Sequence, residues 1–484
     1  MDLVPSNESS RKKPVRKAPA VRKPPENYEQ GELFGRTMTE LVGPEDPVRA
    51  VKPLLRLVNI KPFEDALKLL GAPSYSAAYM LILWIFALWD GERSTRKIEK
   101  LCKHDVRYMY LMDGQTPDHV TINRFRKALG KKRLQQLIVE TIELGKSGGV
   151  TSFERASLDG TKLPSAGSQW IKYLTEAEVA ALKEEAEAEP VSQEPATKPE
   201  TPAKKKKKTR PRKASTDPEA RVQRLTIGGY TNGYNGQVLV DCDSGLILTT
   251  HVTNCASDSG ELTAAMSECL ESYGELPAEL LADAGYDTPA NAEALAGCGV
   301  TGWVSSKDKN SVWSLSPEGK PVCPAGFEAR HPERFNKNGV KVLRLSVRAC
   351  GTCQHREECH ASDCKTVTFP AGVDISHQIR GRARTKTEEG KDMRIQRACT
   401  SELTFAQMKS KLGLKRLHLR GLEGAETELG LTALAYNFMV LARKIGKQGF
   451  EDLARQLFFR IRAIAERYLL TYPRYLPNSY LLAA

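Results

Sequence analysis

The sequence has no apolar run long enough to cross a bilayer. Its longest, Ala77–Trp89, has thirteen residues, whereas a spanning helix needs about 20. We therefore interpret this run as a buried helix. The first thirty residues are polar and rich in Pro, Lys and Arg, so they lack the apolar stretch of a secretory signal. We expect a cytoplasmic protein without a membrane segment.

The cysteines do not form the pattern of a secreted disulfide framework, because there are eleven of them, scattered along the chain. Four are closely spaced in a loop-rich segment, and this spacing suits a structural zinc site in which thiolates bind the metal at about 2.3 Å. They are Cys323, Cys350, Cys353 and Cys359, with His360 and Cys364 as alternatives for the fourth ligand. Reduced cysteines without metal are the competing interpretation.

Basic residues outnumber acidic ones, giving a net charge of +13. Lys and Arg side chains that line a groove displace the counterions condensed on phosphates, so this charge favours a nucleic-acid partner. The alternative is that the excess charge only keeps the chain soluble.

Composition divides the chain into several parts. Residues 1–30 read as a disordered basic tail, because such a sequence cannot bury enough apolar area to fold. Residues 45–148 have helical periodicity, and 151–448 have a mixed α/β pattern. Two insertions interrupt that region: a charged linker over 175–214 and the cysteine-bearing segment over 307–372. Residues 449–484 are expected to be a C-terminal helical extension.

Strand and helix patterns alternate within the mixed region. We expect a hairpin of strands over 237–241 and 246–252, joined by Cys242-Asp243-Ser244-Gly245. A helix over 259–273, a strand over 279–283, a helix over 289–298 and a strand over 300–304 should follow. A long helical segment over 387–412 is expected after the cysteine-bearing insertion.

Two aspartates occur in similar surroundings. Asp159 follows a strand-like run in ASLDGTK, and Asp283 ends the apolar run of LLADAGYD. Taken singly, each is more typical of a turn or a helix cap. Mg²⁺, however, is usually held by a few separated carboxylates together with water and substrate oxygens. Two such ions can activate water and stabilise the leaving oxygen in phosphodiester cleavage.

These motifs resemble those of bacterial insertion-sequence DDE transposases, in the group typified by insertion sequence eleven-eighty-two. The first two motifs are SLDGTK at Asp159 and ADAGYD at Asp283. The third is RACTSELTFAQMK, which contains Arg397, Glu402 and Lys409. The segments RSTRKIEKL and HVTINRFR are similar to the helical N-terminal domain of that group. The resemblance implies an RNase H-like mixed-sheet catalytic core over 151–448, a helical N-terminal DNA-binding domain and a cysteine-bearing insertion.

The resemblance also implies that Asp159, Asp283 and Glu402 are catalytic and bind two Mg²⁺ or Mn²⁺ ions, with the aspartates on neighbouring strands and the glutamate on a helix. Glu388, Glu389 and Glu423 are the alternatives for the third acid. Seven residues advance a helix by about 700°, so Lys409 should lie nearly in line with Glu402. Arg397, five residues before Glu402, should not share its face.

The expected partner is double-stranded DNA, namely the terminal inverted repeats of the element and the target, with the protein associated with the nucleoid. Lys409, Arg397, Arg124 and Arg126 are the expected DNA contacts. The expected assembly is a homodimer or larger, because both element ends must be held together. The alternatives are an inactive or repurposed DNA-binding relative and a metal-dependent nuclease that cuts without strand transfer.

Overall fold

The structure is a computed structural model, and it describes part of the chain. The described residues are 37–57, 60, 75–167, 171–173, 212–214, 216–225, 228–306, 314–323, 325–328, 330–337, 340–346, 352–355, 366–370 and 374–445. The predictions for the tail over 1–30 and the extension over 449–484 lie outside them.

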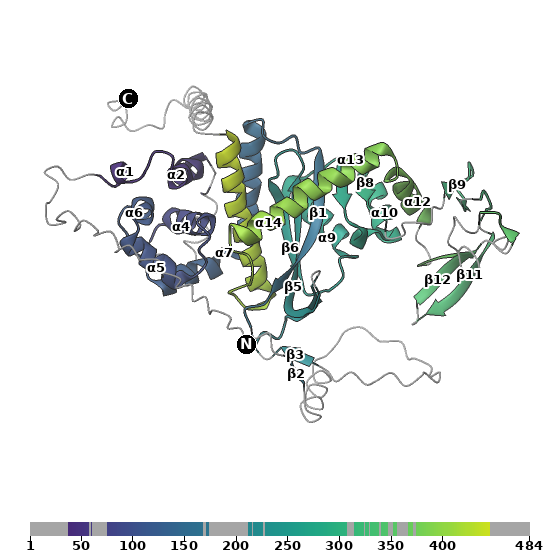
Figure 1. Ribbon diagram of the computed structural model, residues 1–484, viewed down its shortest axis with the longest axis horizontal. Helices are drawn as coiled ribbons and strands as arrows, with labels where there is room; N and C mark the ends of the chain where they lie inside the picture. The colour runs from purple at the N-terminus through teal and green to yellow at the C-terminus, as the bar shows by residue number, and fades with distance from the viewer. Residues whose placement is uncertain are drawn as a thin grey trace, which may run out of the picture.

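The first described part of the chain is helical (Figure 1). Its helices are α1 (Met38–Leu41), α2 (Val48–Leu57), α4 (Ala77–Trp89), α5 (Thr95–His104), α6 (Val106–Met112) and α7 (His119–Ser147). The apolar helix α4 is buried along most of its length, as its sequence predicts. Helix α7 begins where the Asp118 side chain accepts hydrogen bonds from the backbone of Val120 and Thr121. At Gly130 the backbone has a φ of +63°, so α7 is two helical pieces joined by a kink.

A six-stranded mixed sheet lies at the centre of the molecule (Figure 1). Its strands are β1 (Arg155–Pro164), β4 (Arg221–Arg224), β5 (Tyr230–Asp241), β6 (Ile247–Thr253), β7 (Glu279–Ala282) and β8 (Thr301–Val304). The strand order is β4-β5-β1-β7-β8, and β6 also pairs with β5. Strand β1 is antiparallel to β5 and parallel to β7, which is parallel to β8. The mixed α/β, RNase H-like core predicted from the sequence is therefore confirmed.

The hairpin of β5 and β6 is longer than the sequence pattern suggests. Strand β5 begins at Tyr230 rather than at 237, because glycine permits a close crossing with β1. A Cβ atom at Gly233 would lie 2.1 Å from the carbonyl oxygen of Leu163. The periodicity of apolar residues does not reveal this crossing, since glycine contributes nothing to it.

Helices pack on both faces of the sheet. They are α9 (Glu261–Tyr273), α10 (Pro289–Gly297), α12 (Ile375–Arg384), α13 (Glu388–Arg397), α14 (Leu403–Ser410) and a helix over 421–445, with a short 3-10 turn η1 (Ala284–Tyr286) and a π-helical turn η3 (Ala398–Glu402). Figure 1 shows α13 and α14 as one nearly continuous diagonal across the sheet. The helical segment predicted over 387–412 is thus present, interrupted by the π-turn.

Shorter strands lie outside the central sheet. They are β2 (Ile171–Tyr173), β3 (Arg212–Ala214), β9 (Ser314–Leu315), β10 (Pro321–Val322), β11 (Arg330–Lys337), β12 (Val340–Ser346) and β13 (Thr366–Pro370). Strands β2 and β3 pair antiparallel, so the two ends of the charged linker insertion meet. Strands β11, β12 and β13 form a separate sheet within the cysteine-bearing segment. No helix among the described residues combines the length and apolar character needed to cross a membrane.

The helix over 421–445 joins the N-terminal helices to the sheet. The side-chain amide of Asn437 bonds both backbone groups of Ile247 in β6 and the hydroxyl of Thr141 in α7. Nearer its start, Glu428 pairs with Arg93 at 2.7 Å and lies 3.7 Å from Arg126. These contacts are buried, so the helical and mixed regions share one continuous core.

Candidate active site

The structure places Asp159 and Asp283 side by side on parallel strands. Leu158 of β1 is in register with Ala282 of β7, so the next residue of each chain segment is one of the two aspartates. Asp283 directly follows the end of β7, as its sequence suggests. Asp159 instead lies within β1, which continues to Pro164. The strand does not stop at the acid because Gly160 and Thr161 keep pairing with β5.

Asp159 is a largely buried acid with incomplete charge compensation. Its carboxylate accepts hydrogen bonds from the backbone of Gly160 at 2.8 Å and from the Ser401 hydroxyl at 3.3 Å. The Arg397 guanidinium lies 3.5 Å away. Burial nevertheless raises the pKa of Asp159 to about 6, and the neighbouring charge of Asp283 adds to this effect. A cation near these two carboxylates would therefore be stabilised.

Glu402 reaches this region through a departure from α-helical geometry. The π-turn over 398–402 closes i→i+5 hydrogen bonds, so residues five apart lie one above the other. Arg397 consequently meets Glu402, with Nη2 3.0 Å from Oε1, and contacts Asp159 with its other terminal nitrogen. The prediction that Arg397 and Glu402 lie on different faces is wrong, because it assumed an uninterrupted α-helix.

Lys409 also faces the sheet near Asp159. Its Nζ donates a hydrogen bond of 2.5 Å to the Thr161 hydroxyl, two residues along β1 from Asp159. Burial lowers the pKa of Lys409, while the Asp159 carboxylate opposes that shift. Lys409 and Arg397 thus place two positive charges beside the acids.

The alternative third acids are elsewhere. Glu388 and Glu389 lie in the exposed first turn of α13, where Glu388 pairs with Lys391. Glu423 is exposed at the start of the last described helix. Among these four glutamates, Glu402 is the one that, in the described structure, shares an ion-pair partner, Arg397, with Asp159.

A further acid, Asp258, was not identified from the sequence. Its Oδ1 accepts hydrogen bonds from Asn235 at 2.6 Å and Gln237 at 3.0 Å, and the Lys162 ammonium lies 3.4 Å away. The phenol of Tyr286, just after Asp283, donates to Gln237. This network joins the segment that follows Asp283 to β5 and β1. The sequence feature that could have pointed to Asp258 is its position between a strand and a helix.

Glycines bring this network close to the two aspartates. A Cβ atom at Gly160 would lie 2.6 Å from Gln237 Nε2 and 2.9 Å from Asp258 Oδ1. At Gly285 it would lie 2.8 Å from Asp283 Oδ1. A Cβ atom at either position would require these side-chain ends to shift, so the two glycines leave room for the network beside the acids.

The donor atoms suit a hard divalent cation, because Asp159 and Asp283 both supply carboxylate oxygens and each directly follows one of two residues that are in register on neighbouring parallel strands. The side chains as they stand are not a complete ligand set. Among the described residues, no group of three or more His, Cys, Asp or Glu side chains is arranged to hold a metal ion. Arg397 lies between Asp159 and Glu402 and neutralises both, so Glu402 would have to leave Arg397 to join the aspartates.

The two other expected DNA contacts, both on α7, differ from each other. Arg124 is exposed. Arg126 is buried, bonds Asn123 at 2.8 Å, stacks over Trp84 and lies near Glu428. Its charge is compensated inside the protein, so the expectation that Arg126 contacts DNA is corrected. The sequence could not show this, because Glu428 lies about three hundred residues further along the chain.

The zinc prediction falls partly outside the described residues. Cys323 is buried and Cys353 half-buried, and both are free thiols. Cys350 and Cys359 are not among the described residues. The zinc site therefore stays a prediction.

Comparison with known proteins finds two family matches. Residues 36–128 match the family described as Transposase domain (DUF772). Residues 322–442, which include Glu402 but neither aspartate, match the family described as Transposase DDE domain. No curated protein matches the chain.

A solved structure to which the chain is similar is a piggyBac transposase synaptic complex with hairpin DNA. The sequences are 11% identical over 90% of this chain and 86% of that one, with a TM-score of 0.31. The two family matches support an insertion-sequence DDE transposase. They are compatible with the group typified by insertion sequence eleven-eighty-two.

Proposed function

We propose that the protein cleaves the DNA at the ends of its own insertion sequence and joins the freed ends to target DNA. The observation that carries this proposal is the grouping of Asp159, Asp283 and Glu402. Two of these acids come from neighbouring parallel strands, and the third is linked to one of them, Asp159, through Arg397. Carboxylates from separate elements are the ligands that a metal-dependent phosphodiester reaction requires.

In this proposal Asp159, Asp283 and Glu402 are the catalytic residues and hold two Mg²⁺ or Mn²⁺ ions. When bound, such ions activate the attacking water and stabilise the departing 3′ oxygen. Ser401 and the Gly160 backbone orient the Asp159 carboxylate through their hydrogen bonds. The network around Asp258 supports the segment that carries Asp283 from the other side.

The basic side chains have distinct parts in the reaction. Arg397 compensates the charge of Asp159 and Glu402, and its guanidinium becomes free to meet a DNA phosphate once Glu402 turns towards the aspartates. Lys409 is held beside Asp159 by Thr161, where its ammonium can contact the phosphate under attack. The 3′-OH released by cleavage then attacks a phosphodiester of the target DNA, and the P–O bond to the target's own 3′ oxygen breaks as the new P–O bond forms.

The remaining parts of the chain fit the same proposal. The helices within 45–148 form the DNA-binding domain, with Arg124 as an exposed contact, and the mixed region over 151–448 is catalytic. The cysteines at 323, 350, 353 and 359 bind a structural zinc ion that stabilises their insertion. Both element ends have to be held together, so the acting form is a homodimer or larger assembly, at the nucleoid where its DNA lies.

The test is cleavage and joining of labelled duplexes taken from the DNA that flanks the protein's own coding sequence, with Mg²⁺. We expect Asp159→Asn to abolish both steps, and Asp392→Asn, at an exposed acid of α13, to leave both unchanged. Cleavage without joining of supplied pre-cut ends would identify a nuclease instead. Equal activity in both variants would remove Asp159 from the mechanism. Binding without cleavage by the unmodified protein would indicate a repurposed DNA-binding relative.

A further inference from the structure

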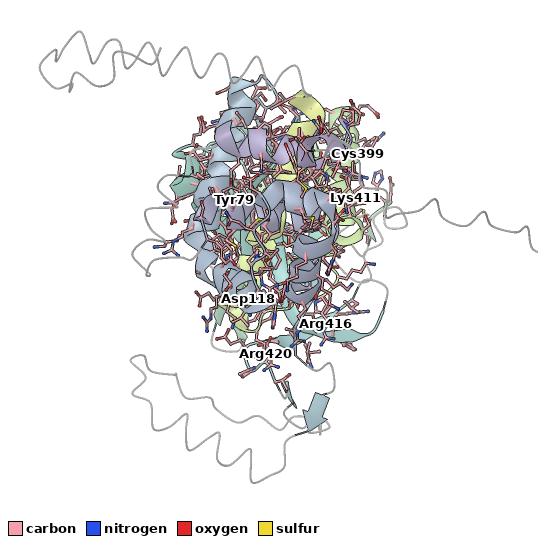
Figure 2. The ribbon with its side chains drawn as sticks, turned by 90° about the vertical axis from the view of Figure 1, so that its left-hand side faces the viewer. Tyr79, Asp118, Cys399, Lys411, Arg416 and Arg420 are labelled. Carbon is pink, nitrogen blue, oxygen red and sulfur yellow. The ribbon has the colours of Figure 1, made fainter. Side chains whose placement is uncertain are left out.

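One large cavity in the described structure is not lined by Asp159, Asp283 or Glu402. It has a volume of about 1480 Å³ and separates two basic walls. One wall is formed by the start of α5 and the first turns of α7, and the other by residues 416–427. We call this cavity the basic cleft. Figure 2 faces this side of the molecule and labels Arg416 and Arg420 of the second wall near Asp118, which caps α7.

Four exposed cations line the basic cleft from both walls: Arg96, Lys127, Arg416 and Arg420. None of them forms an ion pair with an acid among the described residues. Arg416 bonds only backbone oxygens, those of Ser165, Ala166 and Gly167. The charge of these four side chains is therefore available to an external ligand.

The acids that line the same cleft are mostly engaged. Glu219 accepts a hydrogen bond from the backbone of Leu422 at the start of the last described helix. Glu426 lies 3.5 Å from Lys131. Glu423 is exposed and compensates at most one of the four cations. The cleft thus keeps a positive potential, which attracts a polyanion.

The two walls are fixed to one another before any ligand arrives. Arg93, three residues before Arg96, pairs with Glu428 beneath the cleft, and Arg126, next to Lys127, lies against the same carboxylate. All three side chains are buried. A preformed spacing of cations reduces the cost of ordering them on binding.

We propose that the basic cleft binds the sugar-phosphate backbone of duplex DNA, as a site separate from the acids. This inference rests on the proposed function in one respect only, the choice of DNA as the polyanion that binds. Arg416 donates a hydrogen bond to the backbone carbonyl of Ser165. Ser165 lies just beyond the end of β1, six residues from Asp159. At about 3.3 Å per residue this is roughly 20 Å along the strand. With about 3.4 Å per base pair, DNA contacted in the cleft lies roughly six base pairs from the cut.

The test measures binding of a fluorescent duplex by anisotropy, in EDTA so that no cleavage occurs, at several salt concentrations. The probe is a 20-base-pair duplex from the DNA flanking the coding sequence. The variant is Lys127→Gln combined with Arg420→Gln, because both side chains are exposed and form no hydrogen bond or ion pair with another described residue. The matched control is Lys411→Gln, an exposed lysine that does not line the cleft (Figure 2).

Each lost phosphate contact should lower the slope of log affinity against log salt by about 0.9. The double variant should therefore lose about two units of slope and on the order of tenfold in affinity near physiological salt. The control should bind like the unmodified protein. Unchanged thermal unfolding of both variants shows that the difference comes from the cleft.

Two results would overturn this proposal. One is a double variant with the affinity and salt slope of the control. The other is equal loss of binding to a single-stranded probe of the same sequence, which would indicate a site for single strands rather than duplex. Failure of the proposed function gives a different result, namely normal duplex binding that depends on the cleft with no cleavage in Mg²⁺.

Discussion

Two clusters in this molecule combine arginine with carboxylate side chains, and they differ in solvent exposure. We call the cluster around Glu428 the closed cluster and the cluster around Arg397 the open cluster. Around Glu428, the side chains of Arg93, Arg126 and Glu428 are 7%, 6% and 1% exposed. Around Arg397, the glutamate Glu402 is 59% exposed and Asp159 17%. In the first cluster all three side chains are nearly inaccessible to solvent, so their charges serve the fold. The second can exchange a partner, which is what a site for metal and phosphate must do.

Hydrogen bonds extend the contrast. Glu428 also accepts from the backbone of His418 and Leu419, so both of its oxygens are engaged. In the open cluster Glu402 accepts a hydrogen bond from Arg397 alone among the described residues. Removing one member of the closed cluster should therefore destabilise the fold. Removing one member of the open cluster should reduce activity instead.

The largest effect is expected in the closed cluster. Glu428→Gln should lower the free energy of unfolding by about 3–5 kcal/mol, because it leaves two buried arginines without their counter-charge. Urea unfolding followed by circular dichroism measures this. Glu426→Gln, two residues away and only partly buried, is the control. A loss below about 1 kcal/mol for Glu428→Gln would mean that the two clusters do not differ as proposed.

In the open cluster, Glu402→Gln should reduce DNA cleavage by more than about a hundredfold, since even groups that only support a metal ligand contribute about 10–100-fold. Unfolding should change little, because the Glu402 side chain is mostly exposed. Single-turnover cleavage of the flanking duplex is the measurement, and Glu388→Gln on α13 is the control. Cleavage within a few fold of the unmodified protein would exclude Glu402 as the third acid.

Asp159→Asn should raise stability where Glu428→Gln lowers it. Burial raises the folded-state pKa of Asp159 to about 6, above its ordinary value of 3.8. The folded state then binds more protons than the unfolded state between about pH 4 and 6, so unmodified protein loses stability as pH rises through that window. The amide does not titrate, and the variant should gain about 3 kcal/mol above pH 6.

This comparison requires urea unfolding in a chelating buffer at pH 4, 5, 6 and 7. The difference between the two proteins should be small at pH 4 and complete by pH 7. A variant that is less stable than the unmodified protein at pH 7 would show that Asp159 is fully compensated, like Glu428.

The smallest effect should come from the acid that supports the site without joining it. Asp258→Asn keeps the shape of the side chain but removes the charge that faces Lys162, and should lower cleavage by about tenfold. Duplex binding in EDTA should be unchanged. Glu271→Gln, at an exposed acid of α9, is the control. A loss as large as that of Glu402→Gln would instead make Asp258 one of the metal ligands.

The order of elements could be read from the sequence because strands and helices differ in the period of their apolar residues. The position of Asp283 at the end of a strand followed from the same pattern, whereas β1 continues beyond Asp159 to Pro164. The contact between Arg397 and Glu402 could not, since a π-turn changes hydrogen-bond register without changing composition. Asp258 was missed because its partners, Asn235 and Gln237, are polar residues inside a strand and weaken the apolar signal.

The burial of Arg126 shows a different limit. Periodicity describes which face of a helix is apolar, but a charged side chain on that face can be buried if a distant acid meets it. Here the acid comes from the last described helix, and only the three-dimensional arrangement brings it near.

The pairing of Arg93 with Glu428 also bears on synthesis of the protein. Glu428, which neutralises Arg93 of the N-terminal helical region, leaves the ribosome more than three hundred residues after that arginine. Contacts of such long sequence separation form late. A translation product that stops before residue 428 therefore carries two arginines intended for a closed interior, and shortened copies of the gene should yield fragments that proteases remove.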